Sequence, residues 1–200
     1  MAKGLFITFE GIEGSGKTTQ VQMLGLRLRR EGFTVVLTRE PGGTPIGEKI
    51  RHLLLDPSNR EMLPFTELLL YIASRAQHYG ELILPALNRG EIVISDRFLD
   101  ASVAYQGAGR NLPIEWINTL NNMALKGDKP NFTFIIDVDL EESRRRLLGR
   151  DLFPDRLEQE ESDFFNPIRQ NYLALTKSEE ERFKLINGLG RIEDIHETIC

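Results

Sequence analysis

The sequence predicts an α/β fold in which a parallel β-sheet is covered by helices on both faces. Two observations indicate this fold. Short apolar runs rich in β-branched and aromatic residues alternate with segments of helical spacing, and no Pro-, Gly- or Ser-rich linker divides the 200 residues. Crossovers from strand to helix to strand are right-handed and make the strands parallel. We therefore expect a single domain over residues 1–200.

The strands are predicted from uninterrupted apolar runs, which are typical of strands buried on both faces. Four such runs cover residues 5–9, 33–37, 92–94 and 132–138, and a fifth, weaker run covers 183–186. Ligands of such sheets bind at the carboxyl ends of the strands. The residues directly after each run are therefore the first candidates for a functional site.

The helices are predicted from apolar residues spaced three or four apart. Val21, Leu24 and Leu28 mark a first helix that ends at Gly32. A long second helix is expected over 67–87, and the remaining helices over 113–126, 141–150 and 160–176.

Composition and charge exclude several classes of protein. With 25 Lys and Arg against 30 Asp and Glu, the formal net charge is −5, which excludes a strongly basic nucleic-acid binder. No run approaches the roughly 18 apolar residues of a membrane span, so we expect no membrane partner. Cys200 is the single cysteine, a pattern that suits a reducing compartment. We expect a cytoplasmic protein.

A phosphate-binding motif follows the first predicted strand and leads into the first predicted helix. Residues 11–18 read GIEGSGKT, which matches G-x-x-x-x-G-K-[ST] in the required context. Its glycines let consecutive N–H groups face phosphate oxygens, while Lys17 and the hydroxyl of Thr18 reach phosphate and Mg²⁺. The expected ATP-binding residues are Gly11, Ile12, Glu13, Gly14, Ser15, Gly16, Lys17, Thr18 and Thr19.

An aspartate ends the third predicted strand. Asp96 stands where such folds carry the carboxylate that organises Mg²⁺ and its waters, and Arg97 follows it. The alternative is a plain surface ion pair between Asp96 and Arg97. The presence of the phosphate-binding motif favours the metal-site interpretation over it. We expect a Mg²⁺ site made by Thr18 directly and by Asp96 through water.

Two classes of function remain at this point, a kinase for a small molecule and a nucleotide-dependent switch. The chain has no Asn-Lys-x-Asp guanine-reading motif and no Asp-x-x-Gly after a strand, one of which a switch needs. A kinase instead needs arginines from separate loops and a lid that excludes water. Arg39 and Arg97 follow two predicted strands, and Arg150 and Arg156 flank a Pro-containing segment. We expect a lid over about 146–158.

Five motifs together resemble one family. They read FEGIEGSGKTT, TREPGGT, YIASRAQ, SDRFLDASVAYQGAGR and DRLEQEESDFF, in this order. The combination resembles bacterial thymidylate kinase from about Phe6 to about Phe165. The resemblance implies the P-loop nucleoside monophosphate kinase fold with a five-stranded parallel sheet. It also implies a homodimer that transfers a phosphoryl group from ATP to dTMP, giving dTDP for dTTP synthesis.

The resemblance also implies roles for the acceptor site. Glu13 would bind the 3′-hydroxyl of dTMP, and Arg39 and Arg97 would hold its phosphate. Tyr71 would stack on thymine, although the family usually has phenylalanine there, and Arg75 would donate to the base O4. Further expected contacts are made by Ser102 and Gln106 to the base, and by Tyr105, which would exclude ribonucleotides.

The catalytic residues expected from this combination are Lys17, Asp96, Arg97, Arg150 and Arg156. In the family, the arginine that compensates charge on the transferring phosphate lies either in the phosphate-binding loop or in the lid. Gly14 occupies the loop position here, so the resemblance assigns this duty to Arg150 or Arg156.

Overall fold

The protein is built on five parallel strands in the order β2-β3-β1-β4-β5. The computed structural model describes residues 4–149 and 155–200. The strands are β1 (Phe6–Glu10), β2 (Val35–Arg39), β3 (Ile92–Asp96), β4 (Phe132–Asp137) and β5 (Phe183–Asn187). All five predicted strands are confirmed, with ends that differ by one or two residues.

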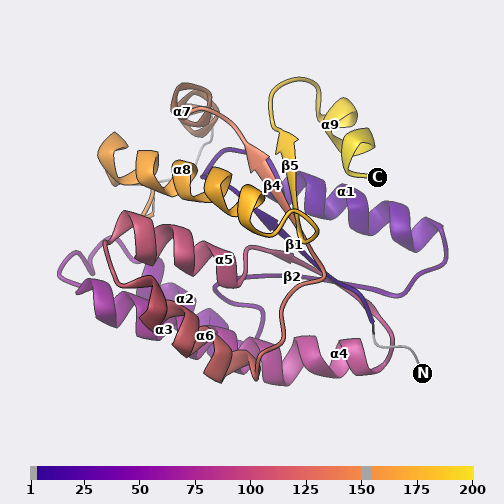
Figure 1. The fold of residues 1–200 in the computed structure, drawn as a ribbon, viewed down its shortest axis with the longest axis horizontal. Helices are drawn as coiled ribbons and strands as arrows, with labels where there is room; N and C mark the ends of the chain where they lie inside the picture. Colours follow the sequence, from indigo (N-terminus) through magenta and orange to yellow (C-terminus); the bar gives the residue numbers. More distant parts are fainter. Residues whose placement is uncertain (1–3, 150–154) are drawn as a thin grey trace.

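Two layers of helices cover the sheet, as Figure 1 shows. The helices α1 (Lys17–Arg30) and α9 (Ile192–Ile199) pack together over one face. Ile7, Ile94 and Ile186 of the strands meet Leu24 and Ile195 of these helices there. The opposite face is covered by the helices that connect β2 to β3, β3 to β4 and β4 to β5. The predicted two-sided cover is confirmed.

The long helix expected over 67–87 is a helical rod with a π-helical turn inside it. It consists of α3 (Pro64–His78), η1 (Tyr79–Ile83) and α4 (Leu84–Asn88). Pro85 has no N–H to donate, and the N–H of Leu84 reaches five residues back to the carbonyl of Tyr79. This widening keeps the rod helical through the proline.

Several helices position the functional residues beside the strand ends. They are α2 (Pro45–Leu55), α5 (Leu99–Ser102), the π-helical η2 (Val103–Gly109), α6 (Ile114–Leu125), α7 (Leu140–Leu148) and α8 (Ser162–Ser178). The sequence pattern did not predict α2, the helical run from α5 to η2, or α9. Thr44 caps α2 by accepting a 3.1 Å hydrogen bond from the N–H of Gly47.

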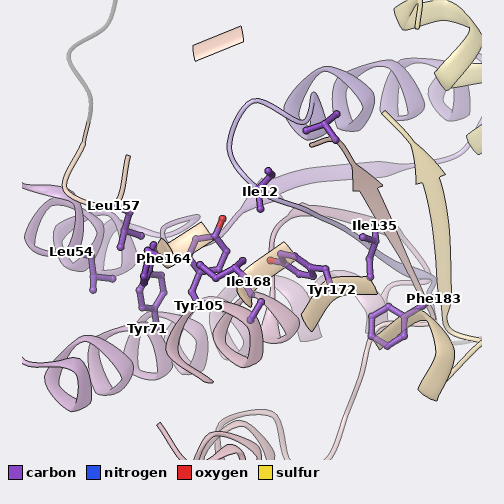
Figure 2. Packing of buried hydrophobic residues seen from close by; sticks show 13 residues of the cluster. Ile12, Leu54, Tyr71, Tyr105, Ile135, Leu157, Phe164, Ile168, Tyr172 and Phe183 are labelled. Atoms are coloured by element: carbon purple, nitrogen blue, oxygen red, sulfur yellow. The ribbon is translucent and has the colours of Figure 1, made fainter. Parts of the chain in front are cut away.

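A core of aromatic and aliphatic side chains lies under the carboxyl ends of the strands. Figure 2 shows Tyr71 of α3, Tyr105 of η2, and Phe164 and Tyr172 of α8 in this cluster. Tyr105 packs edge-on against Phe164 and Tyr172, with ring centroids 6.2 and 6.5 Å apart. Three connections of the sheet therefore meet at one place and hold the tyrosines rigidly.

Among the helices of residues 4–149 and 155–200, we find none that combines the length and the apolar character needed to cross a bilayer.

Candidate active site

The phosphate-binding loop connects β1 to α1. Gly14 has a φ of +71°, and a Cβ added there would lie 2.7 Å from the carbonyl oxygen of Ser143 on α7. The hydroxyl of Ser143 donates a 2.7 Å hydrogen bond to the carbonyl of Glu13. Only glycine combines this backbone conformation with such a close approach. The phosphate-binding loop therefore packs closely against α7.

Lys17 begins α1 and folds over the loop. Its Nζ donates to the carbonyls of Gly11 and Ile12 at 2.9 and 2.7 Å and to the Ser15 hydroxyl at 3.2 Å. Burial, followed by the positive charge of Arg97, lowers the pKa of the Lys17 ammonium to about 8. A phosphate oxygen in this loop would relieve both effects.

Thr18 and Asp96 meet where β3 ends beside the loop. The hydroxyl of Thr18 donates a 2.5 Å hydrogen bond to Oδ2 of Asp96. These two oxygens fit Mg²⁺, because this cation uses one or two protein oxygens and takes its other ligands from water and phosphate. The structure brings together the two residues that the sequence assigns to a metal site.

Arg97, Glu13 and Tyr105 form a triangle over the strand ends. Nη2 of Arg97 donates to Glu13 at 2.8 Å, and the Tyr105 hydroxyl donates to both carboxylate oxygens at 2.9 and 2.8 Å. The Arg97 guanidinium lies 4.8 Å from the centroid of the Tyr105 ring. Among the described residues, Nη1 of Arg97 is a buried donor with no partner. A buried, unpaired cationic donor favours an anionic ligand.

Glu10 is a site residue that the sequence interpretation missed. It ends β1, is fully buried, and accepts 2.7 Å hydrogen bonds from the N–H of Phe98 and the hydroxyl of Tyr172. Burial, and then the charge of Asp100, raises the pKa of Glu10 to about 7. Because Phe98 follows Arg97, Glu10 anchors the chain that carries the triangle. An acidic residue directly after an apolar run, before the glycine that opens the phosphate-binding motif, was the available signal.

Arg75 of α3 is the most heavily bonded cation of the site. Its Nε donates to Glu40 at 2.8 Å, and Nη1 donates to Ser102 at 2.9 Å and Asn121 at 2.8 Å. Nη2 donates to the carbonyl of Phe98 at 3.0 Å. Within residues 4–149 and 155–200, these bonds use four of its five N–H groups and leave one Nη2 hydrogen for a ligand. Ser102, expected to contact a base, here holds Arg75.

Tyr71 and Gln106 line the same side of the cavity as Arg75. Tyr71 lies one helical turn before Arg75, and burial, followed by the charge of Glu67, raises the pKa of its phenol. Gln106 donates from Nε2 to Glu67 at 2.8 Å. The hydrogen bond of Gln106 to a buried carboxylate was not predicted from the sequence.

Arg156 lies in that carboxylate network. Its Nε donates to the carbonyl of Leu54 at 2.8 Å and its Nη2 to Glu67 at 2.6 Å. The side chain is 7% exposed. In this arrangement the guanidinium bonds to Glu67, whereas the resemblance makes Arg156 one of two candidates, with Arg150, for contact with the transferring phosphate. Arg150, the other lid candidate, lies outside the described residues, together with residues 151–154.

Arg39 stands at the rim, where β2 ends. Its Nη2 donates to Glu48 at 3.1 Å, and its side chain is 54% exposed. The expected phosphate-binding pair thus consists of Arg97, whose side chain is 17% exposed, and the more exposed Arg39.

A cavity of about 240 Å³ lies at the carboxyl ends of β1 and β3, and its lining includes most of these residues but not Glu10, Ser102 or Arg156. The sequence-predicted residues among its lining are Glu13, Gly14, Lys17, Thr18, Arg39, Tyr71, Arg75, Asp96, Arg97, Tyr105 and Gln106. Ala101, which also lines it, offers no polar group.

A second cavity of about 430 Å³ lies on the other side of the loop, between α7 and α9. Gly14 to Gly16 and Thr19 face it, with Arg146 of α7 and Ile192 of α9 opposite. Nη2 of Arg146 donates 2.8 Å to the carbonyl of Gly188 and Nη1 donates 3.3 Å to that of Gly14. Arg146 therefore links the phosphate-binding loop to the turn after β5. The sequence had offered no partner for this loop from α7.

Comparisons with known proteins agree with this geometry. The family model described as thymidylate kinase matches residues 9–199. A thymidylate kinase of Halothermothrix orenii is 50% identical over 199 residues, covering 98% of this chain and 95% of its own length. That of Pelobacter propionicus is 49% identical over 201 residues, with coverage of 98% and 92%. The crystal structure of thymidylate kinase from Ehrlichia chaffeensis superposes with a TM-score of 0.78 at 36% identity, covering 98% of this chain and 96% of that one.

Proposed function

Because the chain belongs to the thymidylate kinase family, we propose that the cavity at its strand ends is where a phosphoryl group passes from ATP to dTMP. One observation carries the proposal. Lys17, expected to bind phosphate, and Asp96, expected to act through Mg²⁺, line the same cavity as Arg75 and Tyr105, which are expected to face the base and the sugar. Donor and acceptor can therefore meet in line, which supplies much of the catalysis in this class of reaction.

The ATP phosphates would bind along the loop between β1 and α1. The N–H groups of residues 11–19 and the start of α1 supply partial positive charge, and Lys17 would exchange its carbonyl partners for phosphate oxygens. The cavity between α7 and α9 is continuous with this loop through Gly14, Ser15 and Gly16. We assign it to the nucleoside part of ATP.

Mg²⁺ would be held by Thr18 directly and by Asp96 through water. An ion bound there would supply positive charge that offsets the negative charge of the phosphates. The hydrogen bond between Thr18 and Asp96 keeps both oxygens at the end of β3, beside Lys17.

The phosphate of dTMP would bind to Arg97 and Arg39. The buried Nη1 of Arg97 supports this assignment, because the guanidinium is already fixed by Glu13 and by the Tyr105 ring. Arg39 would add a second, more mobile cation from the rim. Arg97 would orient the acceptor oxygen of the phosphate. Arg39 would contact the phosphate as the substrate enters the cavity.

The sugar would lie against the triangle of Glu13, Arg97 and Tyr105. Glu13 would accept from the 3′-hydroxyl, since a carboxylate has lone pairs beyond those used by Arg97 and Tyr105. The Tyr105 ring, 3% exposed, would fill the space that a 2′-hydroxyl needs. The 2′-hydroxyl of a ribonucleotide would then clash with this ring.

The base would stack on Tyr71 and be recognised at its edge by Arg75 and Gln106. The remaining Nη2 hydrogen of Arg75 suits the O4 carbonyl of thymine and opposes the amino group of cytosine. We propose that Ser102 acts by holding Arg75, and that its own contact with the base is secondary.

The lid would be the segment of about 146–158. The guanidinium of Arg156 is bonded to Glu67 and Leu54, which favours Arg150 for the transferring phosphate. Arg156 would anchor the carboxyl end of the lid to α2 and α3.

We propose a homodimer formed through α3 and α6. Large apolar side chains are exposed on these two helices and the turns before them: Leu63, Phe65, Leu69, Ile114, Trp116 and Met123. Phe65 and Trp116 stack edge-on with centroids 5.7 Å apart. A patch of this kind favours burial against a second copy. The nucleotide substrates and the lone Cys200 agree with a cytoplasmic location.

A panel of acceptors tests the proposed function. ADP production with ATP and Mg²⁺ is measured for dTMP, dUMP, dCMP, dGMP, UMP and AMP, with a sample lacking acceptor. We expect strong turnover with dTMP and weaker turnover with dUMP. The variant Lys17→Ala should be inactive while its circular dichroism spectrum shows that it is folded. Preference for another acceptor would contradict the base assignment, and turnover without acceptor would indicate an ATPase.

A further inference from the structure

Glu67 of α3 is a fully buried carboxylate with four hydrogen-bond donors. Its Oε1 accepts from Nε2 of Gln106 at 2.8 Å and from Nε of Arg110 at 3.3 Å. Its Oε2 accepts from Nη2 of Arg110 at 3.2 Å and from Nη2 of Arg156 at 2.6 Å. Arg156 therefore bonds to Oε2, Gln106 bonds to Oε1, and Arg110 bonds to both oxygens at longer distances.

Glu67 is held in its charged form. Burial alone would oppose ionisation, but the charge of Arg110 and the hydrogen bonds from Gln106 and Arg110 keep the pKa of Glu67 below its ordinary value. An ionised carboxylate only accepts hydrogen bonds. The amide nitrogen of Gln106 must therefore face Glu67, and the amide oxygen must face away from it.

We propose that Glu67 is a positioning residue that sets the base preference of this chain by fixing the orientation of the Gln106 amide. The inference rests on the proposed function, which places the base beside Gln106 in the cavity. Thymine carries an N–H at N3, whereas N3 of cytosine is an acceptor. An amide whose oxygen faces N3 therefore accepts from thymine and opposes cytosine.

A second buried carboxylate serves Arg75 in the same way. Glu40 accepts from Nε of Arg75 at 2.8 Å and is itself 4% exposed. Each group that recognises the base edge is thus oriented by its own carboxylate, Arg75 by Glu40 and Gln106 by Glu67. Discrimination against cytosine then has two independent parts, one at position 4 and one at position 3 of the base.

The variant Glu67→Gln separates these parts. The 2.6 Å contact with Arg156 requires an oxygen at the Oε2 position. The new amide nitrogen would therefore take the Oε1 position, give up the longer 3.3 Å bond from Nε of Arg110, and donate toward Gln106. Gln106 would then turn its oxygen inward and present its nitrogen to N3. We expect the ratio of kcat/KM for dTMP to that for dCMP to fall about 10- to 100-fold, with an absolute gain for dCMP.

Two further variants control for damage to the fold. Arg110→Gln removes a charged partner of Glu67 but leaves the carboxylate facing Gln106, so it should lower the Tm and leave the selectivity ratio within about twofold. In a Gln106→Leu background, adding Glu67→Gln should change the ratio no further, because Glu67 acts through Gln106. An equal loss of both substrates in Glu67→Gln, or an undiminished effect without Gln106, would overturn the proposal.

A measurement on the unmodified protein does not depend on any variant folding. Neutron diffraction from perdeuterated crystals with dTMP locates the two deuterons of the Gln106 amide. Deuterons on the atom that faces Glu67 support the proposal, and deuterons on the atom that faces N3 overturn it. Failure of the proposed function is distinguishable, since the unmodified protein would then show no preference for dTMP over dCMP.

Discussion

Glu10 and Tyr172 are joined by a 2.7 Å hydrogen bond behind the site, although 162 positions separate them in the chain. Glu10 ends β1 and Tyr172 lies on α8, so the bond ties the central strand to the helix between β4 and β5. The second oxygen of Glu10 holds the N–H of Phe98. The carboxylate therefore connects three segments of chain below the triangle of Glu13, Arg97 and Tyr105.

The raised pKa of Glu10 predicts a particular dependence of stability on pH. Between its ordinary value of 4.5 and its folded value of about 7, the folded chain binds a proton that the unfolded chain has released. The free energy of unfolding therefore decreases as pH rises through this window, by on the order of 3 kcal/mol, and this contribution is constant above it. Urea titrations from pH 4.5 to 8 measure it.

Glu10→Gln removes that contribution. Relative to the unmodified protein, the variant should gain stability steadily from pH 4.5 to 7 and then stay level. The control variant Glu197→Gln changes a carboxylate whose side chain is 71% exposed. Its curve of unfolding free energy against pH should run parallel to that of the unmodified protein. A parallel curve for Glu10→Gln would show that Glu10 does not titrate in this range.

The contact between Thr18 and Asp96 predicts how the site depends on magnesium. Asp96→Asn keeps the shape of the side chain and removes its charge, so turnover at fixed Mg²⁺ should fall about 10- to 100-fold and the half-saturating Mg²⁺ concentration should rise. Thr18→Ser retains the hydroxyl and should stay near the unmodified protein. ADP production across a Mg²⁺ titration distinguishes the two. An unchanged Mg²⁺ dependence in Asp96→Asn would remove this residue from the metal site.

Substitutions of Arg150 and Arg156 should have different effects, one on turnover and the other on stability. Arg150→Ala should lower kcat by about 10³-fold with little change in the Kd for dTMP, because its charge is needed only as the phosphoryl group moves. Arg156→Ala leaves a buried carboxylate with one cation fewer, so it should lower the free energy of unfolding by about 3 kcal/mol. Single-turnover kinetics and urea unfolding of both variants test this. If Arg156→Ala is stable but inactive, Arg156 acts on the transferring phosphate and not chiefly on Glu67.

Tyr105 should control exclusion of ribonucleotides through its ring. Tyr105→Ala opens the space beside the sugar, so the ratio of kcat/KM for dUMP to that for UMP should fall at least tenfold. Tyr105→Phe keeps the ring and loses the bond to Glu13, so this ratio should hold while both rates decrease. Equal ratios in all three proteins would mean that another group excludes the 2′-hydroxyl.

The exposed apolar side chains of α3 and α6 should hold two copies together. Leu69→Glu places a charge on a side chain that is 43% exposed in the single chain, and light scattering should then give the mass of a monomer. Leu26→Glu, a similarly exposed site on α1 at 51%, should leave the mass of a dimer. A dimer that survives Leu69→Glu would place the interface elsewhere.

The sequence predicted the sheet well because parallel strands buried on both faces leave continuous apolar runs. Three helical segments escaped prediction for identifiable reasons. The helix α9 has only eight residues, and α2 begins two residues after the paired glycines of the preceding turn, with only Thr44 between them. The run from Leu99 to Gly109 contains π-helical turns, which break the spacing of three and four on which helix prediction depends.

The site was predictable where a motif or a resemblance fixed it, and hidden where it depended on buried carboxylates. Lys17, Thr18 and Asp96 follow strands in a recognisable pattern. Glu10, Glu40 and Glu67 are single acidic residues whose burial becomes visible only when distant elements meet around them. For the same reason the sequence could not show that Arg156 is committed to Glu67, since their bond spans 89 positions.

The close packing of Gly14 against Ser143 has a consequence for the evolution of this enzyme. An arginine at position 14 would need both a left-handed backbone and room now filled by the carbonyl of α7, 2.7 Å from its first side-chain atom. A single codon change there would disrupt the loop before it could contribute a charge. With α7 in this place, a larger side chain could enter position 14 only together with a second change that moves α7 away from the loop.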